Sequence, residues 1–167
     1  MYKIFGIDPG LADTGIGIVC GRDFEIENYS FGCISTNKDT PLAQRLGKIY
    51  DNILKLLEEH KPDRVIVEDI FSLERYPKSG ILLGKVTGAI LLASYHTKIP
   101  VFEVPVREAK KILSGNGNAS KAQLEQSVRH VLEHDSQIKP YHASDALALA
   151  LIGLFRYNTE FYQKEDK

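Results

Sequence analysis

Three acidic residues and one histidine stand where side chains could do chemistry, and the first of them is Asp8. It ends the apolar run Tyr2–Ile7 and is followed at once by Pro9 and Gly10. An apolar run bounded by a Pro-Gly turn predicts a buried strand that stops at the carboxylate. An acid at that place is costly unless something pairs with it, and Mg2+ and Mn2+ are partners that prefer carboxylate oxygens. The plain alternative is an Asp that caps the turn.

The other three candidates are Glu68, His142 and Asp145. Glu68 lies near the end of a second β-branched run, Arg64–Asp69. If the two runs form neighbouring strands, Asp8 and Glu68 share one end of a sheet. His142 and Asp145 are three positions apart at the start of an apolar helix, so they lie on one helix face. Singly, Asp145 could stabilise the helix dipole and His142 could be a surface residue. Together, the four residues favour a common site.

The strands and helices that would position these residues are predicted from the spacing of apolar residues and from the turn-forming residues between them. Strands are predicted over Tyr2–Ile7, Thr14–Cys20, Phe24–Thr36, Arg64–Asp69 and Pro100–Val104; helices over Pro41–His60, Gly80–His96, Val106–Leu113, Lys121–His134 and His142–Tyr157; and a loop over Phe71–Ser79. Three strands at hairpin spacing, then strands joined through helices, predict an α/β protein with a five-stranded mixed sheet flanked by helices. We expect one domain over residues 1–158 and a charged, frayed tail over 159–167.

The composition excludes several classes of protein. The chain has 167 residues, which allows one domain with a real core. Its net charge of -1 does not by itself indicate nucleic acid, so a DNA-binding surface must come from local clusters of Lys and Arg. Cys20 and Cys33 form no CxxC motif, which is typical of reduced thiols in a cytosolic protein. We expect a cytoplasmic protein with no signal peptide and no membrane span.

Five segments of the chain carry a family resemblance: GIDPGLADTG, VEDIF, GKVTGA, FEVPVREAKKILSGNGNASK and ASDALALAL. In this order the sequence resembles the RuvC-type Holliday-junction resolvases, which have the RNase H-like fold. The resemblance runs from Tyr2 to about Phe155. IDPG alone is weakly specific, whereas the five segments in order are strongly specific.

The resemblance implies phosphodiester hydrolysis with divalent metal held at four positions, which map onto Asp8, Glu68, His142 and Asp145. The commonest family pattern has Asp where this chain has His142, and some members are similar in carrying His. Two Mg2+ ions per site are expected, about 3.5–4 Å apart. Mn2+ is an alternative, because imidazole suits it better than it suits Mg2+. His142 could instead hydrogen-bond the attacking water or stabilise the leaving oxygen.

The resemblance also implies contacts with DNA and with other chains. Lys110 and Lys121 match lysines that the family uses at the phosphate backbone, and Phe71 matches an aromatic residue that stacks on bases. Both lysines, together with Arg107 and Lys111, flank the glycine-containing loop SGNGNAS, where backbone N–H groups can approach phosphate. The alternative for Lys111 and Lys121 is a solvated helix face. The family is homodimeric, and helix Gly80–His96 is the candidate interface, with a buried core helix as the alternative. A branch-migration motor is a possible further partner.

The sequence therefore favours a metal-dependent endonuclease that resolves four-way DNA junctions by paired symmetric nicks and leaves 5′-phosphate and 3′-hydroxyl ends. One alternative is a broader branched-DNA endonuclease that acts on forks and flaps. Another is a junction-binding protein with an inactive site. A phosphate-binding domain of the actin-kinase type also begins with Gly-x-Asp-x-Gly, but it needs a second lobe for which this chain is too short.

Overall fold

The computed structural model describes residues 1–69 and 77–156. Its elements in chain order are β1 (Tyr2–Asp8), β2 (Asp13–Arg22), β3 (Glu25–Ser35), α1 (Leu42–His60), β4 (Arg64–Glu68), α2 (Pro77–Thr97), β5 (Val101–Val104), α3 (Val106–Ser114), α4 (Lys121–Val131) and α5 (Tyr141–Phe155). The predicted tail over 159–167 lies outside the described residues. No described helix combines the length and the apolar character that a membrane crossing requires.

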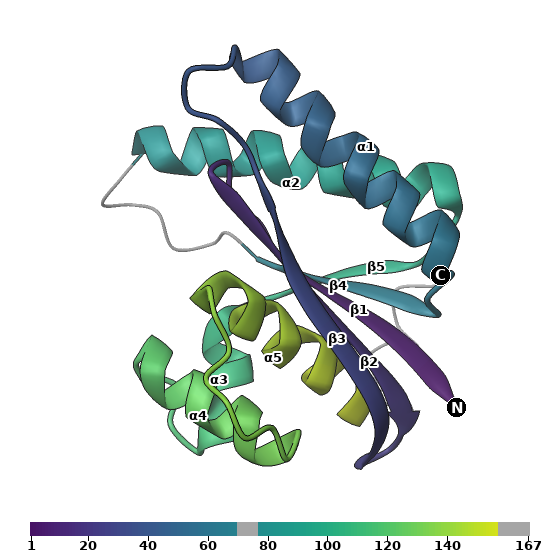
Figure 1. The fold of residues 1–167 in the computed structure, drawn as a ribbon, viewed down its shortest axis with the longest axis vertical. Helices are drawn as coiled ribbons and strands as arrows, with labels where there is room; N and C mark the ends of the chain where they lie inside the picture. The colour runs from purple at the N-terminus through teal and green to yellow at the C-terminus, as the bar shows by residue number, and fades with distance from the viewer. Residues whose placement is uncertain (70–76, 157–167) are drawn as a thin grey trace.

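The five strands form one mixed sheet in the order β3-β2-β1-β4-β5. The pairs β1–β2 and β2–β3 are antiparallel, whereas β1–β4 and β4–β5 are parallel. Helices cover both faces: α1 and α2 lie on one side, and α3, α4 and α5 lie on the other (Figure 1). The predicted five-stranded mixed sheet flanked by helices is therefore confirmed.

Side chains alternate along each strand, so each strand contributes to two cores. Phe5, Ile7 and Val67 pack with α1 and α2, whereas Ile4 and Ile66 pack with the helices of the opposite face. The alternation continues to the ends of β1 and β4. It turns Asp8 and Glu68 toward the face that α5 covers.

Every helix differs from its predicted range at one end or both, and three of these boundaries have a local cause. Helix α2 begins at Pro77, inside the predicted loop, because proline is tolerated in a first helical turn. Helix α4 ends at Val131 rather than His134, since Glu133 takes a positive φ of 50°. Pro41 is the N-cap of α1 rather than its first residue, because its ψ of 142° is extended.

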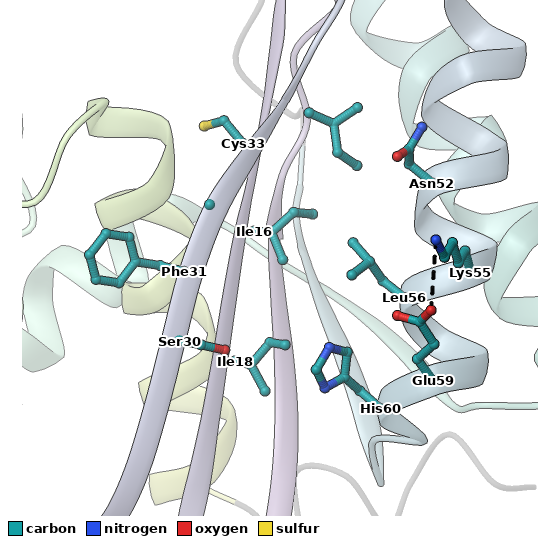
Figure 2. A pocket seen from close by; sticks show the side chains of 12 residues that line it. Ile16, Ile18, Ser30, Phe31, Cys33, Asn52, Lys55, Leu56, Glu59 and His60 are labelled. Atoms are coloured by element: carbon teal, nitrogen blue, oxygen red, sulfur yellow. Dashed lines mark ion pairs between the residues drawn. The ribbon is translucent and has the colours of Figure 1, made fainter.

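A hollow of about 360 Å³ lies between α1 and the antiparallel strands β2 and β3 (Figure 2). Ile16 and Ile18 form its floor, and Leu56 and His60 approach from α1. Helix α5 packs on the opposite face of the sheet. This hollow is therefore separate from the carboxylates at the ends of β1 and β4.

Candidate active site

The site begins with two carboxylates on adjacent parallel strands. β1 pairs with β4 in a register that sets Ile7 against Val67, so Asp8 and Glu68 follow side by side. Asp8 is only 5% exposed although it carries a formal charge. The expectation that the first and fourth strands are neighbours, with both acids at one end, is confirmed.

Helix α5 reaches these carboxylates because three glycines let it lie directly on the sheet. Gly6, Gly15 and Gly17, here called the glycine patch, face its backbone. A Cβ at Gly6 would lie 2.0 Å from the carbonyl oxygen of Ala146, and one at Gly15 would lie 1.9 Å from that of His142. At Gly17 it would lie 2.5 Å from the backbone nitrogen of Leu147. Any larger residue at these positions would hold the first turns of α5 away from the strand ends.

The first turns of α5 carry His142 and Asp145. The imidazole Nδ1 of His142 lies 2.6 Å from Oδ2 of Asp8, to which it donates a hydrogen bond. Asp145 is 5% exposed, and its Oδ2 lies 3.5 Å from the ammonium of Lys121 on α4. The structure therefore brings Asp8, His142 and Asp145 to one place, with Lys121 beside them.

Burial and crowding alter how these groups hold protons. Burial raises the pKa of Glu68 to about 9, helped by a hydrogen bond to Asp8 and by the charges of Asp8 and Asp145, while Lys121 opposes the rise. Burial and the charge of Asp8 also raise the pKa of Asp145. The hydrogen bond to Asp8 raises the pKa of His142 above its ordinary value. Carboxylates are thus crowded here, and burial and mutual repulsion favour the protonated forms of Glu68 and Asp145.

The residues present fit a divalent metal ion. Oδ1 of Asp145 is buried and has no hydrogen-bond partner among the residues that the structure describes, which is unusual for a carboxylate oxygen. Carboxylate oxygens and imidazole nitrogen are ligands for Mg2+ and Mn2+. Within residues 1–69 and 77–156, no three acidic, His or Cys side chains already converge on one metal-sized point. Lys121 and His142 instead pair with the carboxylates, in the place where a metal ion would supply positive charge.

The predicted DNA-binding residues do not lie in one cluster. Arg107 and Lys111 line a hollow of about 550 Å³ together with Gly115, Asn116 and Gly117 of the loop after α3. Lys110 lies on the same helix but does not line that hollow, and Lys121 lies beside Asp145 instead. Phe71 falls outside the described residues.

Two features of the site were missed from the sequence. One is the glycine patch, whose signal is the alternation of glycine with apolar residues in Thr14–Cys20. The other is Arg45 of α1, which donates to the Thr36 hydroxyl at 2.8 Å and to the carbonyl of Leu11 at 3.2 Å. These bonds hold the turn that follows Asp8. No sequence pattern identifies Arg45, because its partners come from other elements.

Together the fold and the cluster define the class of protein: a nuclease with the RNase H-like fold. The chain belongs to the RuvC family, since the family model described as "Crossover junction endodeoxyribonuclease RuvC" matches residues 4–153. Nucleases of this family are metal-dependent.

Individual relatives support the same assignment. The chain is 38% identical over 148 residues to the crossover junction endodeoxyribonuclease RuvC of Thermotoga petrophila, and the match covers 89% of each of the two chains. It is also 38% identical over 154 residues to the protein of that name from Chlorobium phaeovibrioides, covering 92% of this chain and 81% of the relative.

Solved structures agree with the fold. Thermus thermophilus RuvC in complex with a Holliday junction substrate superimposes with a TM-score of 0.87 at 29% identity, covering 94% of this chain and 95% of that one. The yeast mitochondrial Holliday junction resolvase, at 12% identity and a TM-score of 0.64, shares the fold.

Proposed function

We propose that this protein is a metal-dependent endonuclease that resolves four-way DNA junctions by paired, symmetric nicks. The observation that supports it most is the meeting of Asp8, His142 and Asp145 beside Glu68, on a chain that belongs to the RuvC family. Residues that lie far apart in sequence have here been brought to the ends of two central strands. That arrangement suits hydrolysis of a phosphodiester.

Asp8, Glu68, His142 and Asp145 are the residues that would hold the metal, and Asp8 would do so from a rigid strand end. Two Mg2+ or Mn2+ ions would activate water and stabilise the leaving 3′ oxygen. His142 keeps Nδ1 on Asp8, which leaves its other ring nitrogen to bind metal or to exchange a proton with water. Lys121 would leave Asp145 for a DNA phosphate when the metal supplies the positive charge.

DNA would lie across the loop after α3. The hollow between Arg107 and Lys111 is lined by glycine and asparagine, where backbone N–H groups can approach a phosphate. Lys110 adds positive charge on the same helix. Phe71 is proposed to stack on bases at the junction centre, which contributes about 1–3 kcal/mol per base.

The proposed active form is a homodimer with α2 at its interface. One side of α2 is buried against the sheet through Val86, Ile90 and Ala93. The other side exposes large apolar residues, namely Ile81, Leu82, Leu92 and Tyr95. A second copy related by a two-fold axis would cover this side and place two equivalent sites for the two strands to be cut.

The dimer is tested with Leu92→Glu, which places a charge in the proposed interface. We expect monomers by sedimentation, and single nicks in place of paired ones. Phe24→Glu is the control, because Phe24 is also a large exposed apolar residue but lies at the β2–β3 turn. A Leu92→Glu variant that remains dimeric would refute the interface.

A cytoplasmic location and a branch-migration motor as partner stay predictions.

The activity is tested on a synthetic four-way junction labelled on each strand in turn, in Mg2+ and in Mn2+. We expect symmetric nicks from the wild type and none from Asp8→Asn. Asp13→Asn is the matched control, because Asp13 bonds Ser35 and not the cluster. Forked and flapped substrates run in parallel identify a broader branched-DNA endonuclease. Junction binding without nicks in either metal would overturn the catalytic proposal.

A further inference from the structure

A buried carboxylate on α4 takes no part in the proposed chemistry. Glu125 is 2% exposed, and its Oε1 accepts a hydrogen bond from the backbone N–H of Ile138 at 2.9 Å. The same oxygen lies 2.8 Å from Nε of Arg129, one helical turn further along. A buried carboxylate is costly unless it is paired in this way. Its contact with a backbone N–H thirteen residues away joins α4 to the segment that enters α5.

That segment determines where α5 begins. Ile138 is fully buried and lies four residues before His142. The N-cap of α5 is Pro140, and no side chain in the described part of the chain caps this helix end. The start of α5 therefore depends on the chain that leads into it and on its packing against the glycine patch. Because Glu125 holds Ile138, it fixes the point from which the first turn of α5 extends.

Helix α4 contacts this region at two places on one face. Lys121 and Glu125 are four residues apart, so their side chains extend from the same side of the helix. Lys121 reaches Asp145, and Glu125 reaches the backbone of Ile138. The two contacts lie on either side of His142 in the sequence. Helix α4 thus braces the turn that carries the histidine.

Stability alone does not account for a charge at this position. Leu124 and Val128 already fill the core beside α4, and both are fully buried. A well-packed apolar residue commonly replaces a buried ion pair with no loss of stability. A carboxylate here adds a directed hydrogen bond, which specifies the path of the backbone as well as its burial.

We propose that Glu125 is a positioning residue for the reaction: by holding the N–H of Ile138 it keeps His142 in contact with Asp8. This inference rests on the proposed nuclease function only in that His142 takes part in the reaction. The contacts of Glu125 are to Ile138 and Arg129, and at 2% exposure its side chain is buried away from the surface where a substrate would bind.

The first test compares Glu125→Gln with Glu125→Leu. The glutamine amide oxygen can still accept from Ile138, so we expect the Gln variant to cut junctions within about threefold of wild type. The Leu variant should lose about 10–100-fold in kcat, because a misplaced catalytic group is costly, while its affinity for junction DNA is unchanged. Val128→Ala is the control, since it weakens the same helix and leaves the hydrogen bond from the Ile138 N–H to Glu125 in place. Equal loss of kcat in Val128→Ala, or failure of Gln to rescue, would refute the proposal.

The second test asks whether Glu125 acts through His142. In a His142→Ala background, Glu125→Leu should cause little further loss of kcat, because the two changes remove one function. A full additional loss would overturn the inference. Glu125→Met replaces Glu125→Leu in both tests if the latter does not fold, since its unbranched side chain follows the path of glutamate.

The third test needs no cleavage. The imidazole 15N and 1H signals of His142 in the metal-free protein should match wild type in Glu125→Gln and shift in Glu125→Leu. Unshifted signals in Glu125→Leu would refute the positioning role. If the wild type cut no junction, the proposed function would fail while this measurement stayed readable.

Discussion

Replacing Gly15 by alanine should displace the start of α5, because the helix backbone lies directly over this glycine. The added Cβ would lie 1.9 Å from the carbonyl oxygen of His142 and 2.4 Å from its carbonyl carbon. Real Cβ atoms essentially never approach other atoms within 3.0 Å, so the two must separate by about 1.1 Å more. The obstructing atoms belong to the backbone, so no side-chain rotation relieves the contact. Helix α5 has to move, and His142 and Asp145 move with it.

The cost follows from the size of this displacement. Overpacking a core costs about 1–3 kcal/mol, and a contact between backbone and Cβ belongs at the upper end of that range. Glycine in a strand is itself unfavourable by about 0.5–1 kcal/mol relative to alanine, which offsets part of the loss. The net loss is about 2 kcal/mol. For a domain of this size it lowers Tm by about 4–8 °C.

Activity should fall further than stability. A misplacement of about 1 Å costs roughly 10²-fold in rate, so Gly15→Ala should lose about two orders of magnitude in junction cutting at a temperature where it stays folded. Its affinity for Mn2+ should also weaken, because Asp145 moves away from Asp8.

The control is Gly32→Ala in the neighbouring strand β3, where an added Cβ meets no atom within 4 Å. This variant should keep its activity, and its Tm should rise by about 1–4 °C. Thermal melts and initial rates on a labelled junction measure both variants. If Gly15→Ala melted and cut like wild type, α5 would not lie on the strand as described.

Three further predictions concern protons and metal. The pKa of Glu68 is near 4.5 in the unfolded chain and about 9 in the folded protein, so the folded state binds more protons between these two pH values. The free energy of unfolding of the metal-free protein should therefore fall as pH rises from about 5 to 9. The raised pKa of Asp145 acts in the same direction. Melts in EDTA measure this slope, which Glu68→Gln should flatten, and an unchanged slope would refute the assignment. Because metal must displace such protons, Mn2+ affinity measured by calorimetry should rise with pH, about tenfold per unit for each proton released; affinity that is independent of pH would argue against it. His142→Asp should raise the rate in Mg2+ relative to Mn2+, since a carboxylate suits Mg2+; an unchanged ratio of the two rates would exclude His142 as the residue that sets metal preference.

The sheet and its carboxylates could be predicted because their signals are local. The apolar run that ends in Asp8 and a Pro-Gly turn predicts a strand and also the residue at which that strand ends. The alternation of side chains then places Asp8 and Glu68 on one face once their strands are neighbours. The shared helix face of His142 and Asp145 could be predicted from the helical period alone. Helix ends were predicted less well, since proline occupies both loops and first helical turns, as at Pro77.

The contacts within the site could not be predicted, because they join distant parts of the chain. His142 and Asp8 are 134 residues apart in the sequence, and neither segment predicts the contact between Nδ1 of His142 and the carboxylate of Asp8. DNA binding by Lys121 stays a prediction, and its ion pair with Asp145 was not foreseen. The glycine patch is visible as a pattern, but its purpose depends on a helix that begins more than a hundred residues later. Periodicity identifies which face of an element is buried, and only the packed structure identifies what lies against it.

The site described here accommodates its own charge in the absence of metal. Lys121 and His142 each contact one carboxylate, and burial keeps Glu68 protonated at neutral pH. A divalent ion held by these carboxylates would supply positive charge to them and to Oδ1 of Asp145, which has no hydrogen-bond partner within residues 1–69 and 77–156. Metal binding should therefore release a proton and free Lys121, whose ammonium is then available to a phosphate at the same place. Under the proposed roles, one lysine pairs with Asp145 before metal binds and contacts the substrate afterwards.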